Sequence, residues 1–137
     1  EEVYSQPASA TVAQLTGSPP MNLIPSLIED GFARADGFSI PVTGASGRVL
    51  LGIRPEEITL GGRLPGRVEV VQPLGRKIIV ELAIGQYSRL KMAVPSGPQI
   101  RRGDAVGVGF SPESVRVFNA DTGELVPAAP QGPPVPV

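Results

Sequence analysis

The sequence predicts a mainly β protein, built as a small barrel with a short helix before it and a proline-rich tail after it. Turn-forming residues recur throughout the 137 residues, with 17 Gly and 16 Pro. Hydrophobic residues make up 41% of the chain, which is enough for a packed interior and argues against general disorder. Short strands separated by turns roughly every 8 to 12 residues are typical of sandwiches and small barrels.

The first 22 residues are expected to hold a short helix and a linker. Ser9 is a suitable N-cap, and Val12, Ala13 and Leu15 form a narrow apolar face over residues 10–16. A helix this short is unstable alone, so we expect it to dock on this domain or on a neighbour. Prolines stiffen the segment that follows and make it a hinge candidate. The hinge candidates are Gly17, Ser18, Pro19, Met21 and Asn22.

Between residues 21 and 54 the pattern changes to short strands. The dipeptides Asp30-Gly31 and Asp36-Gly37 are hairpin signals. Pro25 is expected to interrupt the first strand, because proline cannot donate to a strand ladder. The expected strands are 21–28, 32–35, 38–40 and 48–54, with a loop at 44–47.

A single helical turn is predicted directly after the fourth strand. Pro55 suits the first helical position, and the carboxylates of Glu56 and Glu57 are favourable near a helix N-terminus. Arg54 before the turn has two readings: an ion pair across an interface, or a local pair that fixes the corner, which we favour. A catalytic role for Glu56 and Glu57 is disfavoured, because adjacent carboxylates rarely converge on one substrate.

The second half repeats the strand-and-turn pattern. Gly75 is expected to support a turn of positive φ, although a regulatory contact there is an alternative. Gly103-Asp104 marks another turn. Residues 127–137 contain five prolines, which predicts an extended, solvated and flexible tail. The expected strands are 67–72, 76–84, 87–94, 105–110 and 115–118, followed by a turn at 119–123.

The composition excludes several kinds of chemistry. The chain has no Cys and no His, which rules out disulfides, thiolate metal sites and His-dependent catalysis. With 12 basic and 13 acidic residues, it has no positive surplus for a phosphate backbone, so nucleic acid is not an expected partner. The glycine-rich stretches 44–47 and 61–62 lack the Lys and Ser or Thr of a phosphate-binding loop. No apolar run of about 18 residues predicts a membrane span.

Four segments carry a family resemblance. They are 3–22 (VYSQPASATVAQLTGSPPMN), 51–56 (LGIRPE), 68–75 (VEVVQPLG) and the motifs GD, FSPE, VF and TG between 103 and 123. In this order they resemble the C-terminal portion of ATP-binding subunits of sugar-type ABC importers, the group that includes the maltose and glycerol-phosphate importers. The resemblance extends to about Val126 and departs at Gln72, where the family more often has an acidic residue.

The resemblance implies an oligonucleotide-binding-type β-barrel, the TOBE domain, over residues 23–126. An ATPase domain would precede it, and residues 1–22 would come from the junction, because Glu1 in place of an initiator Met suggests a piece of a longer protein. ATP and Mg²⁺ would bind only in that upstream domain. This chain is therefore not expected to be an enzyme, and no catalytic, cofactor or metal residue is predicted in it.

The family uses this barrel for contacts. The resemblance implies a regulatory and dimerisation role or, as the alternative, sensing of a small anion or other small ligand. The expected partners are a second copy of the chain, its own ATPase domain, membrane permease subunits and a regulatory protein, on the cytoplasmic side of the inner membrane. The candidate interface residues are Arg54, Pro55, Glu56, Glu57, Gly75, Gly103, Asp104 and Glu113.

Overall fold

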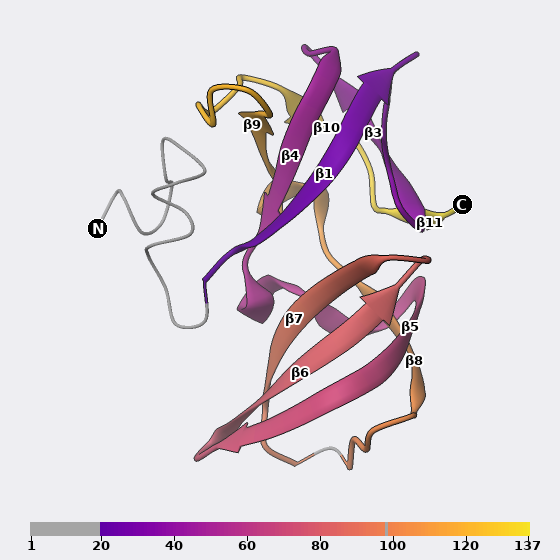
Figure 1. Cartoon of the computed structure of the whole chain (residues 1–137), viewed down its shortest axis with the longest axis vertical. Coiled ribbons are helices and arrows are strands. Elements are labelled where there is room, and N and C mark those ends of the chain that lie inside the picture. Colours follow the sequence, from indigo (N-terminus) through magenta and orange to yellow (C-terminus); the bar gives the residue numbers. More distant parts are fainter. Residues whose placement is uncertain (1–19, 98) are drawn as a thin grey trace.

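The described part of the protein is built mainly from strands, as the computed structural model in Figure 1 shows. The structure describes residues 20–97 and 99–137; the helix expected at 10–16 and the hinge candidates Gly17, Ser18 and Pro19 lie outside these ranges. The predicted β-barrel fold of the OB type is confirmed. The strands are β1 (Asn22–Glu29), β2 (Phe32–Ala35), β3 (Phe38–Thr43), β4 (Gly47–Ile53), β5 (Thr59–Leu74), β6 (Lys77–Ile84), β7 (Ser88–Pro95), β8 (Ala105–Gly109), β9 (Arg116–Asn119), β10 (Ala129–Pro130) and β11 (Val135–Pro136), with 3₁₀ turns η1 (Pro55–Glu57) and η2 (Pro112–Ser114).

The strands form two antiparallel sheets. The first has the order β10-β3-β2-β1-β4-β9, with β11 also paired to β3, and the second has the order β7-β6-β5-β8. The first sheet therefore combines segments from both ends of the described chain, whereas the second is formed by its middle. In Figure 1 the first sheet occupies the upper part of the molecule and the second the lower part. The chain crosses between the sheets twice, from β4 to β5 and from β8 to β9.

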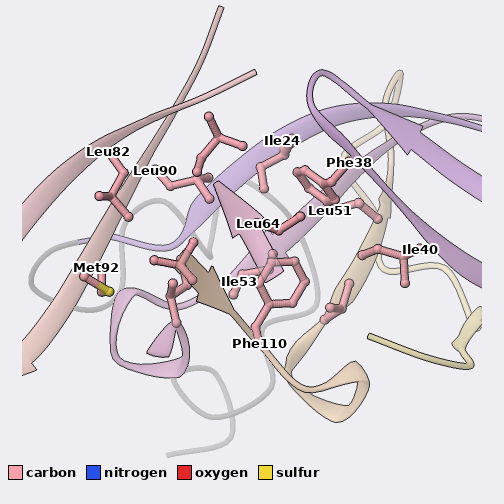
Figure 2. Close-up of a cluster of buried hydrophobic side chains, with 14 of the residues drawn as sticks. Ile24, Phe38, Ile40, Leu51, Ile53, Leu64, Leu82, Leu90, Met92 and Phe110 are labelled. Atoms are coloured by element: carbon pink, nitrogen blue, oxygen red, sulfur yellow. The ribbon is translucent and has the colours of Figure 1, made fainter. Parts of the chain in front are cut away.

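One hydrophobic core joins the two sheets. Alternate residues of the paired strands β6 and β7 face it, and Leu82 and Leu90 stand opposite each other with no exposed surface. Phe38 of the first sheet meets Phe110 edge to face, with ring centroids 5.9 Å apart. Figure 2 shows side chains from both sheets gathered in this interior. Packing of this kind is the main stabilising contribution in a domain of this size.

Three strands differ from the prediction: β1 is not interrupted, β3 runs to Thr43 instead of 40, and β5 begins earlier. β1 continues through Pro25, because β2 pairs only with residues 27–29 and the prolyl nitrogen can face the open edge. β5 begins at Thr59 instead of 67, and its first half is rich in glycine, which locally indicates a turn. Gly62 lies against the backbone of Val108, where a Cβ would be 2.3 Å from the carbonyl carbon. The glycines that obscure the strand pattern thus permit this close approach.

Residues 127–137 differ from the predicted solvated tail. They are extended, but β10 pairs with Thr43 and Val42, and β11 pairs with Ser39 and Phe38. The prolines that suggested a free segment are compatible with an outermost strand, because an edge position needs donors on one side only.

Candidate interface at the paired Pro-Glu turns

The two crossings between the sheets are built alike. On the first sheet Gly52 pairs with Arg116, and on the second Thr59 pairs with Gly109. The intervening segments, 53–58 and 110–115, are therefore equal in length and lie opposite each other. Each folds into a single 3₁₀ turn that begins with Pro-Glu, at Pro55 in η1 and at Pro112 in η2.

The backbone of both turns is held in the same way. The residue before each proline is extended, as proline requires, with φ −75° at Arg54 and φ −81° at Ser111. The residue after each turn donates its N–H to the prolyl carbonyl, from Ile58 over 3.3 Å and from Val115 over 3.2 Å. The side chains of Ile58 and Val115 are buried, so both turns are anchored to the core.

An ion pair links the two turns. The Arg116 Nη1 donates to Glu57 Oε1 over 3.0 Å, and both side chains are largely buried, with 18% and 25% of their surfaces exposed. The same nitrogen donates to the Ser114 carbonyl over 2.7 Å, while the backbone N–H of Arg54 donates to Glu57 Oε1 over 3.0 Å. Glu57 thus fixes its own corner and holds the opposite turn. The sequence analysis did not predict a role for Arg116. The signal that could have indicated it is the second Pro-Glu pair, Pro112-Glu113, which lies just before it.

Glu56 and Glu113 occupy equivalent places and are exposed. Each follows its proline on a turn that is closed by a backbone hydrogen bond and anchored by a buried side chain, Ile58 or Val115. A partner would meet these carboxylates without first having to order a loop, which lowers the entropic cost of association.

The other predicted residues lie at two ends of the second sheet. Gly75 is at the tip of the β5–β6 hairpin with φ +65°, which confirms the expected positive φ, and its carbonyl accepts from Ser96 Oγ over 2.9 Å. Gly103, also at positive φ, donates its N–H to the Val68 carbonyl over 2.7 Å. Asp104 Oδ2 accepts from the Arg101 N–H over 2.9 Å. The structure brings Arg54, Glu57 and Glu113 together at the paired turns. Gly75, Gly103 and Asp104 lie elsewhere, in turns of the second sheet.

The two described hinge candidates hold β1 in place. Met21 is buried against Phe118 on the face of the first sheet opposite the main core. The Asn22 side chain accepts from the Lys91 N–H over 2.8 Å and donates to the Ile53 and Lys91 carbonyls over 3.1 and 2.9 Å. Asn22 therefore ties both β4 and β7 to the start of β1.

Another contact between the sheets was not predicted at all. The turn at Asp36-Gly37 meets the turn that joins β6 to β7. The Asp36 carboxylate accepts backbone N–H groups from Gln86 over 3.0 Å, from Tyr87, and from Ser88 over 2.9 Å. These hydrogen bonds, first those from Gln86 and Tyr87, lower the pKa of Asp36 below its ordinary value. The sequence marked Asp36-Gly37 only as a turn.

Within residues 20–97 and 99–137, no three carboxylates are grouped so that they could hold a metal ion. No helix in the same ranges is long and apolar enough to cross a membrane. The arrangement can position charges and bind a partner.

Comparisons with known proteins agree with this arrangement. A family model described as the TOBE domain matches residues 51–118, and one described as the MalK OB fold domain matches residues 17–58. Similar proteins include the xylose/arabinose import ATP-binding protein XacK of Haloferax volcanii, 32% identical over 91% of this chain and 37% of the relative. The trehalose/maltose import ATP-binding protein MalK of Thermococcus litoralis is 32% identical over 92% of this chain and 40% of its own length. The sn-glycerol-3-phosphate import ATP-binding protein UgpC of Ruegeria pomeroyi is 34% identical over 91% and 37%. The chain thus spans 37–40% of the length of these curated relatives.

Proposed function

This chain belongs to the TOBE and MalK OB-fold domains of ATP-binding subunits of sugar and glycerol-phosphate ABC importers, and from that premise we propose that it is their regulatory and dimerisation domain. The observation that carries the proposal is the pair of Pro-Glu turns. The TOBE match runs from Leu51 to Phe118 and so includes both turns from end to end. The turns that are held by buried anchors and by the Glu57–Arg116 pair also present Glu56 and Glu113 to a partner.

The mechanism would be positional. Two copies of the domain would hold two ATPase domains together while these open and close around ATP and Mg²⁺. A regulatory protein that binds one arrangement better than the other would shift that equilibrium by its difference in affinity. ATP hydrolysis itself would take place in the ATPase domain, next to membrane permease subunits on the cytoplasmic side. The transported solute would be a sugar or a related compound.

Sedimentation of the chain over a range of concentrations tests the dimer. We expect reversible self-association, weakened about tenfold when both turns are reversed in charge by Glu56→Lys and Glu113→Lys. The matched control reverses two exposed charges elsewhere, by Asp121→Lys and Glu124→Lys, and should leave the association unchanged. A chain that stays monomeric, or one whose association ignores the turn variants, would count against dimerisation through this surface.

A second candidate is sensing of a small oxyanion. One observation favours it: Arg67, Arg102 and Gly103 line the same surface hollow beside the irregularity in β5 between Val68 and Val70. Calorimetric titration with molybdate, sulfate and a sugar phosphate tests it. Binding that is lost in the Arg67→Gln, Arg102→Gln variant would support sensing, and absence of heat with all three anions would dismiss it.

A further inference from the structure

The outer edge of β3 is covered by residues 127–137, which pair with it through two short strands, β10 and β11 (Figure 1). The Gln131 N–H donates to the Pro41 carbonyl over 2.8 Å, and the Val137 N–H donates to the Gly37 carbonyl over 3.2 Å. The segment therefore follows β3 along its whole length, from the turn before it to its last residue.

Side chains add to this contact. Gln131 Nε2 donates to Thr43 Oγ1 over 3.2 Å, and Pro134 is buried. At Gly132 an added Cβ would lie 3.3 Å from the Pro41 ring, so the chain passes close to β3 there. The segment thus contacts the edge at both ends of β3 and near Pro41.

The sequence of the segment ends the sheet. In an antiparallel ladder the N–H and C=O of one residue point to the same side, and neighbouring residues alternate. Since Gln131 next to β10 and Val137 next to β11 each donate to β3, this alternation turns their neighbours Pro130 and Pro136 away from it. Proline has no N–H, so the new outer edge offers no donor at these two positions to another strand.

Without the segment, β3 would present a different edge. Its sequence, FSIPVT, includes the strand-favouring residues Phe38, Ile40, Val42 and Thr43, and an uncovered strand edge with open backbone groups is prone to pair with another chain. The backbone of Ser39 and Thr43 would face outward on either side of Pro41. Two copies of β3 related by a two-fold axis at Pro41 would place Ser39 of one copy opposite Thr43 of the other, and each pair could exchange N–H···O bonds. The edge is therefore complementary to itself.

We infer that the outer edge of β3 is a strand-acceptor site, and that residues 127–137 occupy it within the same chain and thereby prevent β3-to-β3 pairing with a second copy. This surface is separate from the Pro-Glu turns and goes beyond the proposed function. The segment serves as an internal, proline-rich competitor for the acceptor edge.

The test removes the competitor. A variant that ends at Val126 is compared with the 137-residue chain by light scattering over a concentration series, both carrying Glu56→Lys and Glu113→Lys to weaken the other proposed contact. We expect at least tenfold tighter self-association of the shortened chain, reversed by excess synthetic peptide of residues 127–137. Equal association of the two chains, with no binding of the peptide to the shortened one, would overturn the inference.

A full-length pair of variants guards against misfolding. Pro134→Asp places a charge at a buried position of the segment, whereas Pro133→Asp places it at the exposed neighbour. With unchanged circular dichroism, Pro134→Asp should associate like the shortened chain and Pro133→Asp like the parent. Adding Thr43→Pro removes a donor from the acceptor edge and should reverse the association. Association that survives Thr43→Pro would refute pairing through β3.

Discussion

Two of the joints between the sheets of this protein use different physical means. The crossing joint, residues 53–58 and 110–115, is covalent: the chain itself passes from one sheet to the other twice. The hairpin joint is the contact of Asp36-Gly37 with residues 85–88, and no chain connects its two halves directly. The first needs only local turns. The second needs two hairpins from distant parts of the chain to fit against each other.

The difference lies in which atoms form the contact. At the crossing joint the contact is made by side chains: Ile58 and Val115 are buried in the core, and Glu57 pairs with Arg116. At the hairpin joint one carboxylate meets backbone N–H groups, and two glycines allow the backbones to touch. A side chain added to the hairpin joint should therefore be more harmful than one removed from the crossing joint.

The largest effect is expected from Gly85→Ala. A Cβ at Gly85 would lie 2.7 Å from the Asp36 carbonyl oxygen, and the residue has φ +66°. The strained φ and the overlap with the facing turn together should lower the free energy of unfolding by about 2–4 kcal/mol. Chemical denaturation followed by circular dichroism measures this loss.

Gly75→Ala is the matched control. Gly75 has φ +65° in the equivalent hairpin turn between β5 and β6, but a Cβ there would have no atom within 4 Å. This variant should lose only the conformational part, about 1 kcal/mol. Equal losses at Gly75 and Gly85 would show that the hairpin joint does not hold the sheets.

The contrast between the joints also explains what the sequence could predict. The turn signals at Asp30-Gly31 and Asp36-Gly37 and the alternation in β6 and β7 placed most strands within one or two residues. They are local patterns, set by backbone chirality and by the two-residue period of a strand. The first half of β5 and the docking of residues 127–137 were missed, because glycine and proline signal a turn locally and only their distant neighbours show why they are there.

The second prediction concerns Glu57 at the crossing joint. Glu57→Ala removes the acceptor for both the Arg54 N–H and Arg116 Nη1 in a largely buried place. Loss of such a largely buried, hydrogen-bonded pair should lower the free energy of unfolding by about 1–3 kcal/mol. Thermal and chemical denaturation of the purified variant measure it.

Glu56→Ala serves as the neighbouring control. Glu56 is exposed, so its removal should change stability by no more than about 0.5 kcal/mol. Glu56→Ala should weaken self-association directly. Glu57→Ala should weaken it only by destabilising the folded domain. A stability loss at Glu56 as large as that at Glu57 would contradict the division between a structural and a presenting carboxylate.

Only part of the candidate site could be predicted from the sequence, for the same reason. Pro55, Glu56 and Glu57 stand together in the sequence, so a helical turn with acid groups near its start could be predicted from three residues. The role of Glu57 depends on Arg116, which is distant in sequence and reaches it only because β4 pairs with β9. Asp36 accepts from backbone N–H groups, and these carry no side-chain signature in any sequence.

The smallest effect, and the most specific, is the pH dependence of the hairpin joint. The hydrogen bonds from Gln86, Tyr87 and Ser88 hold the pKa of Asp36 below its ordinary value, so the folded state favours the ionised carboxylate. Its contribution to stability is therefore fully present above the pKa that Asp36 has in the unfolded chain. It is lost as the pH falls through the lower pKa of the folded chain. Asp36→Asn should destabilise the protein less than Glu57→Ala, by an amount that stays constant near neutral pH and shrinks in acid.

Denaturation of the parent and the Asp36→Asn variant from about pH 7 to about pH 3 tests this sign. The difference between the two proteins isolates Asp36, because the other carboxylates titrate in both. Asp30→Asn, in the turn between β1 and β2, is the control: Asp30 is exposed at φ +55°, a conformation that Asn tolerates. A gap between the parent and Asp36→Asn that widens as the pH falls would mean that the protonated carboxyl is the form the folded joint prefers. The backbone N–H groups of residues 86–88 would then not be what holds the first sheet against the second.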